Sequence, residues 1–390
     1  MDEFGMTMAQ INAAGAHWTA REVLQQPALW AQTEQLIAAE SARLSGFLEP
    51  LLGRSELRVV LTGAGTSAHI GKCLAPALTR IYGRRIDAIA STDLVASPHS
   101  YLSAQTPTLL VSFGRSGNSP ESVAAIERAD ACVPDCWHLI ITCDPEGALY
   151  RRARQAPRCC AILMPAAAND RSYAMTSSFT VMLLAAALVL RAVPANGARA
   201  LGLARLAQQL LAKRLPLLQE LVRCGFNRVV YLGSKEFKGL AREAALKMLE
   251  LTDGRVVAIG DSPLGFRHGP KTILNSDTLV IVFVGNDDYA RQYDWDLIDE
   301  LRHDAVAGRV VALAARPGVR QHPDDVIAEA LRDSMDISDL ELCLPYAVFA
   351  QSLALLRSIS LGLLPDNPNA TGTVSRVVTG VSIHPLRGGA

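Results

Sequence analysis

The chain has 390 residues, a length that favours two domains. Its 38 lysines and arginines balance 38 aspartates and glutamates, which argues against a protein that binds nucleic acid through a basic surface. Hydrophobic residues form 49% of the chain and aromatic residues 5%, which excludes a disordered chain and predicts large cores built from aliphatic side chains.

The N-terminus and the apolar segments predict neither an export signal nor a membrane span. No basic stretch leads into a hydrophobic one near residue 1. The longest apolar run, residues 181–190, is shorter than the roughly 20 residues that cross a bilayer. We therefore expect a cytoplasmic protein with no membrane partner.

A helical arm, predicted for residues 19–52, precedes a pattern of strands that occurs twice. Segments 58–63 and 108–112 have the composition of strands, and they recur at 228–233 and 278–282, both 170 residues later. A third predicted pair of strands is 139–142 with 310–313, and helices are predicted at 67–78, 179–190, 198–221 and 235–251.

Strands that alternate with helices form parallel sheets with right-handed crossovers. We therefore predict an α/β protein with two tandem domains, each a three-layer αβα sandwich around a mostly parallel sheet. The expected division is a helical arm at 1–50, a first domain at 51–197, and a linker helix, second domain and C-terminal tail at 198–390.

Eight cysteines are scattered along the chain without a CxxC pair, so disulfides are not expected. The densest group of soft metal ligands is Cys132, Cys136, His138 and Cys143, around a predicted strand. Side chains along a strand alternate between the two faces of a sheet, so these four would not converge on one ion. We expect buried thiols and no metal site.

Two glycine-rich turns follow the first two predicted strands of the first copy, Gly63-Ala-Gly-Thr-Ser67 and Gly114-Arg-Ser-Gly-Asn-Ser119. Parallel sheets bind ligands beyond the carboxyl ends of their strands, where helix N-termini direct amides at an anion. A third hydroxyl cluster, Thr176-Ser-Ser178, precedes an apolar helix. The predicted phosphate-binding residues are Thr66, Ser67, Gly114, Arg115, Ser116, Ser119 and Thr176.

Glycine and serine also close turns and cap helices, which is the alternative for any one of these loops. The second copy differs from the first. Its first turn, Gly233-Ser-Lys-Glu236, keeps one serine, and its second turn, Gly285-Asn-Asp-Asp288, would repel phosphate. We therefore expect one phosphate site per chain, in the first copy, and another role for the second.

Thr62-Gly-Ala-Gly-Thr-Ser67 and Ser112-Phe-Gly-Arg-Ser-Gly-Asn-Ser119 resemble the phosphate loops of the sugar isomerase (SIS) domain family. The two copies, with Ala244-Ala-Leu-Lys-Met-Leu-Glu250 and Phe266-Arg-His-Gly-Pro270, resemble the isomerase half of glucosamine-6-phosphate synthase. Only about fifty residues precede the first strand, so we expect no glutaminase domain to supply ammonia. Within the family the chain is most similar to the AgaS group of galactosamine-6-phosphate deaminases.

The resemblance implies an enzyme that converts galactosamine 6-phosphate and water to tagatose 6-phosphate and ammonia. It implies that Glu250 is the base that moves a proton between C2 and C1, and that Lys247 orients Glu250 or stabilises negative charge. Both residues share a face of a predicted helix with Glu243. From the residues alone, an exposed Lys/Glu pair is the alternative.

By the same resemblance, His268 opens the sugar ring from the neighbouring subunit, which implies at least a dimer with a shared active site. Arg376 aligns with a lysine that contacts the sugar, and its role as substrate ligand or tail anchor stays open. Arg115 replaces a neutral amide and could give the phosphate or a hydroxyl a charged partner. No metal or organic cofactor is expected, because enolisation needs only the base and charge stabilisation.

Two other functions remain open from the sequence. Related proteins with two SIS domains cleave fructosamine-type sugar 6-phosphates, and a non-catalytic phosphosugar sensor is also conceivable. The retained Glu250 and His268 argue against the sensor. The sequence does not distinguish the C4 epimers galactosamine and glucosamine, because that choice depends on pocket shape.

Overall fold

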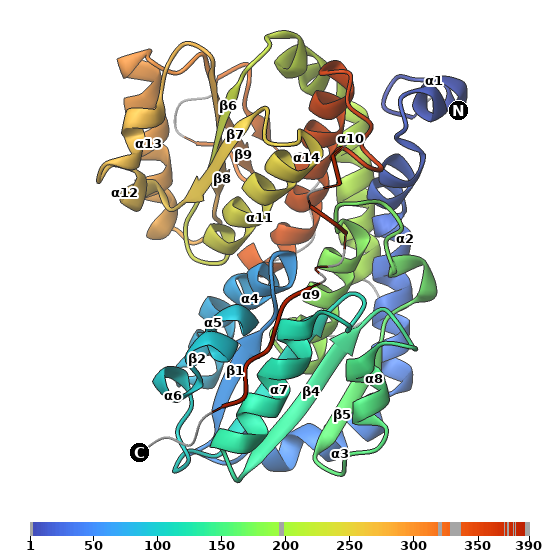
Figure 1. Cartoon of the computed structure of the whole chain (residues 1–390). Coiled ribbons are helices and arrows are strands. Elements are labelled where there is room, and N and C mark those ends of the chain that lie inside the picture. The colour runs from blue at the N-terminus through green and yellow to red at the C-terminus, as the bar shows by residue number, and fades with distance from the viewer. Residues whose placement is uncertain are drawn as a thin grey trace. The chain divides into compact units, whose positions relative to one another are not determined.

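The computed structural model describes residues 3–194, 199–318, 322–327, 337–369, 371–372, 374–376, 378 and 380–386. The chain forms two compact units, and each contains one five-stranded sheet (Figure 1). The first-sheet unit comprises Gln32–Asp170, Ser177–Ala195 and Thr371–Ala390. The second-sheet unit comprises Met1–Ala31, Arg171–Thr176 and Asn196–Ala370. The units interleave along the chain, and the domain boundaries expected at 50 and 197 stay a prediction.

In the first-sheet unit every strand pair is parallel, and the order is β2-β1-β3-β4-β5. The strands are β1 (Arg58–Thr62), β2 (Ile86–Ala88), β3 (Thr108–Gly114), β4 (Cys136–Thr142) and β5 (Cys159–Leu163). The helices are α3 (Ser41–Leu52), α4 (Thr66–Tyr82), α5 (Ser91–Ala96), α6 (Pro98–Tyr101), α7 (Pro120–Cys132), α8 (Ala148–Ala153), η1 (Ala166–Ala168) and α9 (Ser177–Val189).

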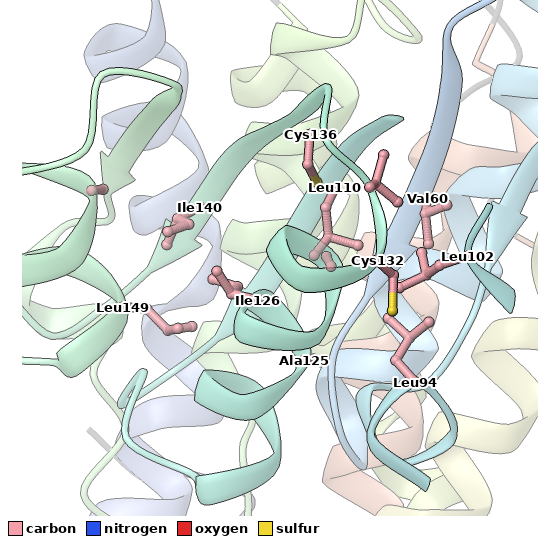
Figure 2. Close-up of a cluster of buried hydrophobic side chains, with 13 residues drawn as sticks. Val60, Leu94, Leu102, Leu110, Ala125, Ile126, Cys132, Cys136, Ile140 and Leu149 are labelled. Carbon is pink, nitrogen blue, oxygen red and sulfur yellow. The ribbon is translucent and has the colours of Figure 1, made fainter. Parts of the chain in front are cut away.

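Aliphatic side chains form the core of this unit, as the composition predicts. Val60 of β1, Leu110 of β3 and Ile140 of β4 pack with Ile126 of α7 (Figure 2). All four are fully buried, and each such side chain contributes about 1.5–3 kcal/mol relative to exposure to water. Helix α9 is buried on every side, which explains its uniformly apolar sequence.

In the second-sheet unit the order is β10-β9-β8-β6-β7, again entirely parallel. The strands are β6 (Arg228–Gly233), β7 (Val257–Asp261), β8 (Thr278–Val284), β9 (Arg309–Ala314) and β10 (Val326–Ile327). The helices are α1 (Met8–Ala13), α10 (Arg199–Arg223), α11 (Glu236–Leu251), α12 (Pro263–Phe266), η2 (Pro270–Ile273), α13 (Ala290–Asp304) and α14 (Asp339–Ser360). Helix α2 (His17–Ala39) begins in this unit and ends in the first-sheet unit.

The predicted α/β fold with parallel sheets is confirmed, and the second sheet repeats the strand order of the first. The strands β2, β5, β7 and β10 and the long helices α13 and α14 were not predicted from the sequence. By length and composition α14 could cross a bilayer, but 94% of its apolar window is buried inside the protein. It packs against α10 and α11, so its apolar sequence is explained by a core.

Candidate active site

The turn between β1 and α4 requires glycine at two positions. A Cβ on Gly63 would lie 2.6 Å from the Cβ of Ser67, so only glycine allows the strand to pass this close to the helix. Gly65 has φ 54° and ψ −126°, a conformation that favours glycine, and α4 begins at the next residue. Thr66 and Ser67 are therefore in the first turn of α4, where the positive end of the helix dipole attracts anions, although the Ser67 amide already donates to the main-chain oxygen of Ala64 at 3.0 Å.

The neighbouring turn begins where β3 ends, beside β1. Thr62 and Ser112 are register partners on these adjacent strands. Among the described residues neither hydroxyl has a hydrogen-bond partner, although both are buried. Arg115 is 5% exposed; its Nη2 donates to the main-chain oxygen of Arg376 at 3.3 Å, and its Nη1 has no partner among the described residues. Buried polar groups of this kind are expected to bind a ligand or water.

We call the buried polar groups beside these two turns, Thr62, Ser112 and Arg115, the first-sheet cup. Arg115 was predicted from the sequence as a binding residue, but Thr62 and Ser112 were not singled out. Their signal was a hydroxyl residue one or two positions before the first glycine of each glycine-rich turn. The serines that it did predict have local partners. Ser119 caps α7, accepting a hydrogen bond from the amide of Ser122 at 3.3 Å, and Ser116 accepts one from the amide of Asn118 at 3.3 Å. Capping and phosphate binding are compatible, and the phosphate role of both serines stays a prediction.

The third hydroxyl cluster is divided between the two units. Thr176 is buried in the second-sheet unit, and its carbonyl accepts a hydrogen bond from Nε2 of Gln351 at 3.4 Å. In the first-sheet unit, Asp170 accepts from the amides of Ser177 and Ser178 at 3.0 and 2.9 Å and from the Ser178 hydroxyl at 2.6 Å. These bonds cap α9, so helix capping explains Ser178.

Helix α11 carries the predicted acid–base group. Lys247 lies between two carboxylates: its Nζ is 3.6 Å from Oε1 of Glu243 and forms an ion pair with Glu250. The side chains of Lys247 and Glu243 are 1% and 2% exposed, whereas that of Glu250 is 25% exposed. Glu250 is therefore the carboxylate of this triad that a substrate can reach, and the prediction that the three share one helix face is confirmed.

His268 is exposed in the turn between α12 and η2. Its ring has no hydrogen bond or ion pair among the described residues, and no contact joins it to Glu250 there. The residues around it are fixed more firmly: Arg267 and Lys271 both pair with Glu300. The side chain of His268 is therefore exposed at the surface of the second-sheet unit. Arg376 is also exposed, and its main chain contacts Arg115.

The corresponding turns of the second-sheet unit are occupied by the protein's own carboxylates. Asp294 accepts from the Ser234 hydroxyl at 2.6 Å and from the Gly285 amide at 3.3 Å. Asp339 accepts from the Asn286 amide at 2.6 Å. Burial raises the pKa of Asp294 to about 6, and the nearby charge of Asp339 adds to this effect. Amides of the second turn are thus used internally, and the expectation that the turn at 285–288 repels phosphate stays a prediction.

One part of the argument against a metal site was wrong. Cys136 and His138 are two residues apart on β4 and share a face of the sheet, and with Asp130 of α7 they bring three possible ligand atoms within 4.8 Å. Asp130 is already paired with His138 at 2.8 Å and with Arg152. Burial raises the pKa of Cys136 to about 12, which disfavours the thiolate that a metal needs. The absence of a metal stays a prediction.

The fold and the glycine-rich turns define a protein of the SIS class, and the SIS domain family matches residues 52–192. The chain belongs to the AgaS family within this class. D-galactosamine-6-phosphate deaminase AgaS of Escherichia coli is 45% identical over 378 residues, 96% of this chain and 97% of that protein. An AgaS protein of Streptomyces coelicolor is 49% identical over 372 residues, 94% of this chain and 95% of that protein.

Solved structures agree with this family. Tagatose-6-phosphate ketose/aldose isomerase of Escherichia coli has a TM-score of 0.87 and 44% identity, and the match covers 95% of this chain and 97% of that one. The C-terminal domain of glucosamine-fructose-6-phosphate aminotransferase of Francisella tularensis has a TM-score of 0.74 at 16% identity, covering 90% and 98%. The second likeness shows a shared fold across both halves of the chain.

Proposed function

We propose that this chain is a D-galactosamine-6-phosphate deaminase that produces tagatose 6-phosphate and ammonia. The observation that carries the proposal is the 45% identity to Escherichia coli AgaS over nearly the full length of both chains. The buried, unpaired hydroxyls beside two glycine-rich turns and the partly exposed Glu250 of the Lys247 triad support it. In the cell we expect the enzyme to act in the cytoplasm.

In this proposal the first-sheet unit binds the phosphate. The N-terminal turn of α4 and the hydroxyls of Thr66 and Ser67 supply donors, and Arg115 supplies a positive charge. The turn residues Gly114, Ser116 and Ser119 complete the proposed donor set in this unit, and the phosphate role of Thr176 stays a prediction.

The reaction transfers one proton and exchanges nitrogen for oxygen. After ring opening, Glu250 removes the proton from C2 and the electron pair forms a C1–C2 double bond. The C1 oxygen takes a proton from the ammonium group on C2, giving an enolamine. Glu250 returns the proton to C1, which leaves a protonated imine at C2. Water adds to this imine, and ammonia departs to leave the ketone. Lys247 holds Glu250 in place through the ion pair.

Glu250→Gln tests this assignment. We expect ammonium release from galactosamine 6-phosphate to fall at least about 10³-fold, because the amide cannot accept the C2 proton. Binding of galactitol 6-phosphate, which has no carbonyl, should change little in calorimetry. Glu127→Gln on the exposed face of α7 is the matched control and should match the wild type. Full turnover by Glu250→Gln would refute Glu250 as the base.

The substrate itself is tested with the wild type. Ammonium release is measured from galactosamine 6-phosphate and glucosamine 6-phosphate in parallel, and a clear preference for the first is expected. Tagatose 6-phosphate without an amine is the third substrate. If it is converted to an aldose phosphate while no amino sugar is deaminated, the chain is a ketose/aldose isomerase and the deaminase proposal fails.

We further propose an active site shared between at least two subunits, in which His268 opens the ring bound by the neighbouring subunit. Its exposed position supports this. A mixture of Glu250→Gln and His268→Ala chains, dissociated and reassembled together, should regain part of the activity that each variant lacks. Sedimentation should show a dimer or larger. No regain in mixed assemblies would contradict a shared site.

A further inference from the structure

The segment 171–176 of the second-sheet unit is held rigidly at its start. The carboxylate of Glu22, a buried residue of α2, accepts from the Ser172 amide at 3.2 Å and also from the Ser172 hydroxyl and the Arg171 amide. The amide of Tyr173 donates to the main-chain oxygen of Asp366 at 3.1 Å. A buried carboxylate that receives several donors orders a loop strongly, so the position of Tyr173 is well defined.

The four residues 366–369 connect Tyr173 to the end of α11. The Asp366 carboxylate caps the first turn of α2, accepting from the amides of Trp18 and Thr19 at 3.0 and 2.7 Å. Three residues later, Nδ2 of Asn369 donates to Oδ1 of Asp253 at 2.9 Å. Asp253 follows Glu250 by three residues, so the Tyr173 backbone and the region around Glu250 are fixed to the same short segment.

The phenol of Tyr173 is close enough to this region to be influenced by its charges. Burial raises the pKa of Tyr173, the negative charges of Glu250 and Asp253 raise it further, and Lys247 opposes them. The phenol therefore stays protonated across the physiological range. The ring is half-buried, and its hydroxyl has no hydrogen-bond partner among the described residues.

The proposed reaction needs a donor that the Lys247 triad does not supply. When Glu250 removes the C2 proton, negative charge develops on the oxygen attached to C1. The ammonium of Lys247 is already paired with two carboxylates, so its charge is largely balanced. A neutral hydroxyl beside this triad can stabilise the oxygen without neutralising the base.

We propose that Tyr173 is a catalytic residue that donates a hydrogen bond to the C1 oxygen of the substrate during proton abstraction by Glu250. This inference rests on the proposed function. No bond to Tyr173 forms or breaks, and the phenol keeps its proton. The C2–H electron pair becomes the C1–C2 double bond, and the C1 oxygen, held by the phenol, takes a proton from the substrate's own C2 ammonium. When Glu250 returns its proton, the double-bond pair becomes the new C1–H bond and the nitrogen lone pair forms the imine.

Tyr173→Phe tests the proposal, since it removes the hydroxyl and keeps the ring. The kcat for ammonium release should fall about 10²-fold, the size of effect seen when one donor to a developing oxyanion is removed. Exchange of the C2 proton for deuterium, followed by NMR, should slow by a similar factor. The Kd for galactitol 6-phosphate and the Tm should stay within error of the wild type. Tyr289→Phe, 70% exposed on the α13 side, is the matched control.

The possible results of these measurements distinguish a failure of the Tyr173 proposal from a failure of the proposed deaminase function. Wild-type rates of exchange and ammonium release in Tyr173→Phe would overturn the role of Tyr173 alone. A lowered Tm with kcat unchanged at saturating substrate would show a structural role and overturn it as well. If the wild type releases no ammonium but exchanges the C1 proton of tagatose 6-phosphate, the deaminase fails, and slower exchange in Tyr173→Phe still supports the inference. A wild type that exchanges neither proton overturns both.

Discussion

The first turns of the two units share a backbone conformation and differ in what surrounds it. Gly65 has φ 54° and ψ −126°, and Lys235, at the same place in the second-sheet unit, has φ 54° and ψ −121°. A Cβ added to Gly63 would lie 2.6 Å from the Cβ of Ser67, and one added to Gly233 would lie 2.4 Å from the Cβ of Phe237, so both glycines allow an equally close approach to the following helix. The strand–turn–helix geometry therefore does not by itself make an anion site.

The side chains around the turns make the difference. In the first-sheet unit, buried hydroxyls and a guanidinium nitrogen have no partner among the described residues. In the second-sheet unit, Asp294 and Asp339 occupy the amides of the next turn, and Lys235 lies 3.4 Å from Asp339. A carboxylate on the chain takes the place of a bound anion there, which leaves the second unit free to supply the acid–base group.

The largest effect on the free energy of unfolding is expected from removing the charge of Asp294, which accepts from the Gly285 amide in the second turn of the second-sheet unit. In the folded protein burial holds the pKa of Asp294 at about 6, against 3.8 as its ordinary value. The folded state thus binds the extra proton, and its stability falls as pH rises through the window from about 4 to 6. Ser234 and the Gly285 amide favour the ionised form, as does Arg291, while Asp339 opposes it.

Asp294→Asn should remove this dependence, because the amide is neutral at every pH and retains an oxygen acceptor. Relative to the wild type, its free energy of unfolding should rise by about 3 kcal/mol between pH 4 and pH 7, measured in urea titrations. Ammonium release should be unaffected. A constant difference between the two proteins across this range would show that Asp294 is not the group that titrates.

The next largest effect is expected on substrate binding, from removing the charge of Arg115 in the first-sheet cup. Arg115→Met should raise the KM for galactosamine 6-phosphate and the Kd for galactitol 6-phosphate about 30-fold, because a charged hydrogen bond to the phosphate is lost. The value of kcat should change little. Arg291→Met, near Asp294 and Asp339 in the second-sheet unit, is the matched control and should bind normally. Equal weakening by both variants would remove the distinction between the two turns.

Much of the difference between the turns of the two units could be predicted from the sequence, because the turns are defined by local sequence patterns. Strand, glycine-rich turn and helix follow one another along the chain, so the turns at Gly63 and Gly114 and the acidic turn at 285–288 were predicted correctly. The short strands β2 and β10 were not, since three and two residues carry too little hydrophobic pattern. Contacts between distant segments were also missed: the hydrogen bonds of the Gly285 amide to Asp294 and of Asn369 to Asp253 follow only from the fold.

The smallest effect should come from Gly65 itself. A Cβ at this position meets no heavy atom within 4 Å, so Gly65→Ala adds only the cost of a positive φ, about 1 kcal/mol of unfolding free energy. Gly46→Ala in the middle of α3 also meets no atom, yet it should stabilise by roughly 0.5–1 kcal/mol, because alanine is the better helix former. If urea titrations show a loss of unfolding free energy in Gly65→Ala and a gain in Gly46→Ala, backbone conformation explains why alanine has opposite effects at the two positions. Since Lys235 already accepts a positive φ at the corresponding place, a loss well above 1 kcal/mol in Gly65→Ala would contradict the view that backbone conformation is the only reason for glycine in the first turn.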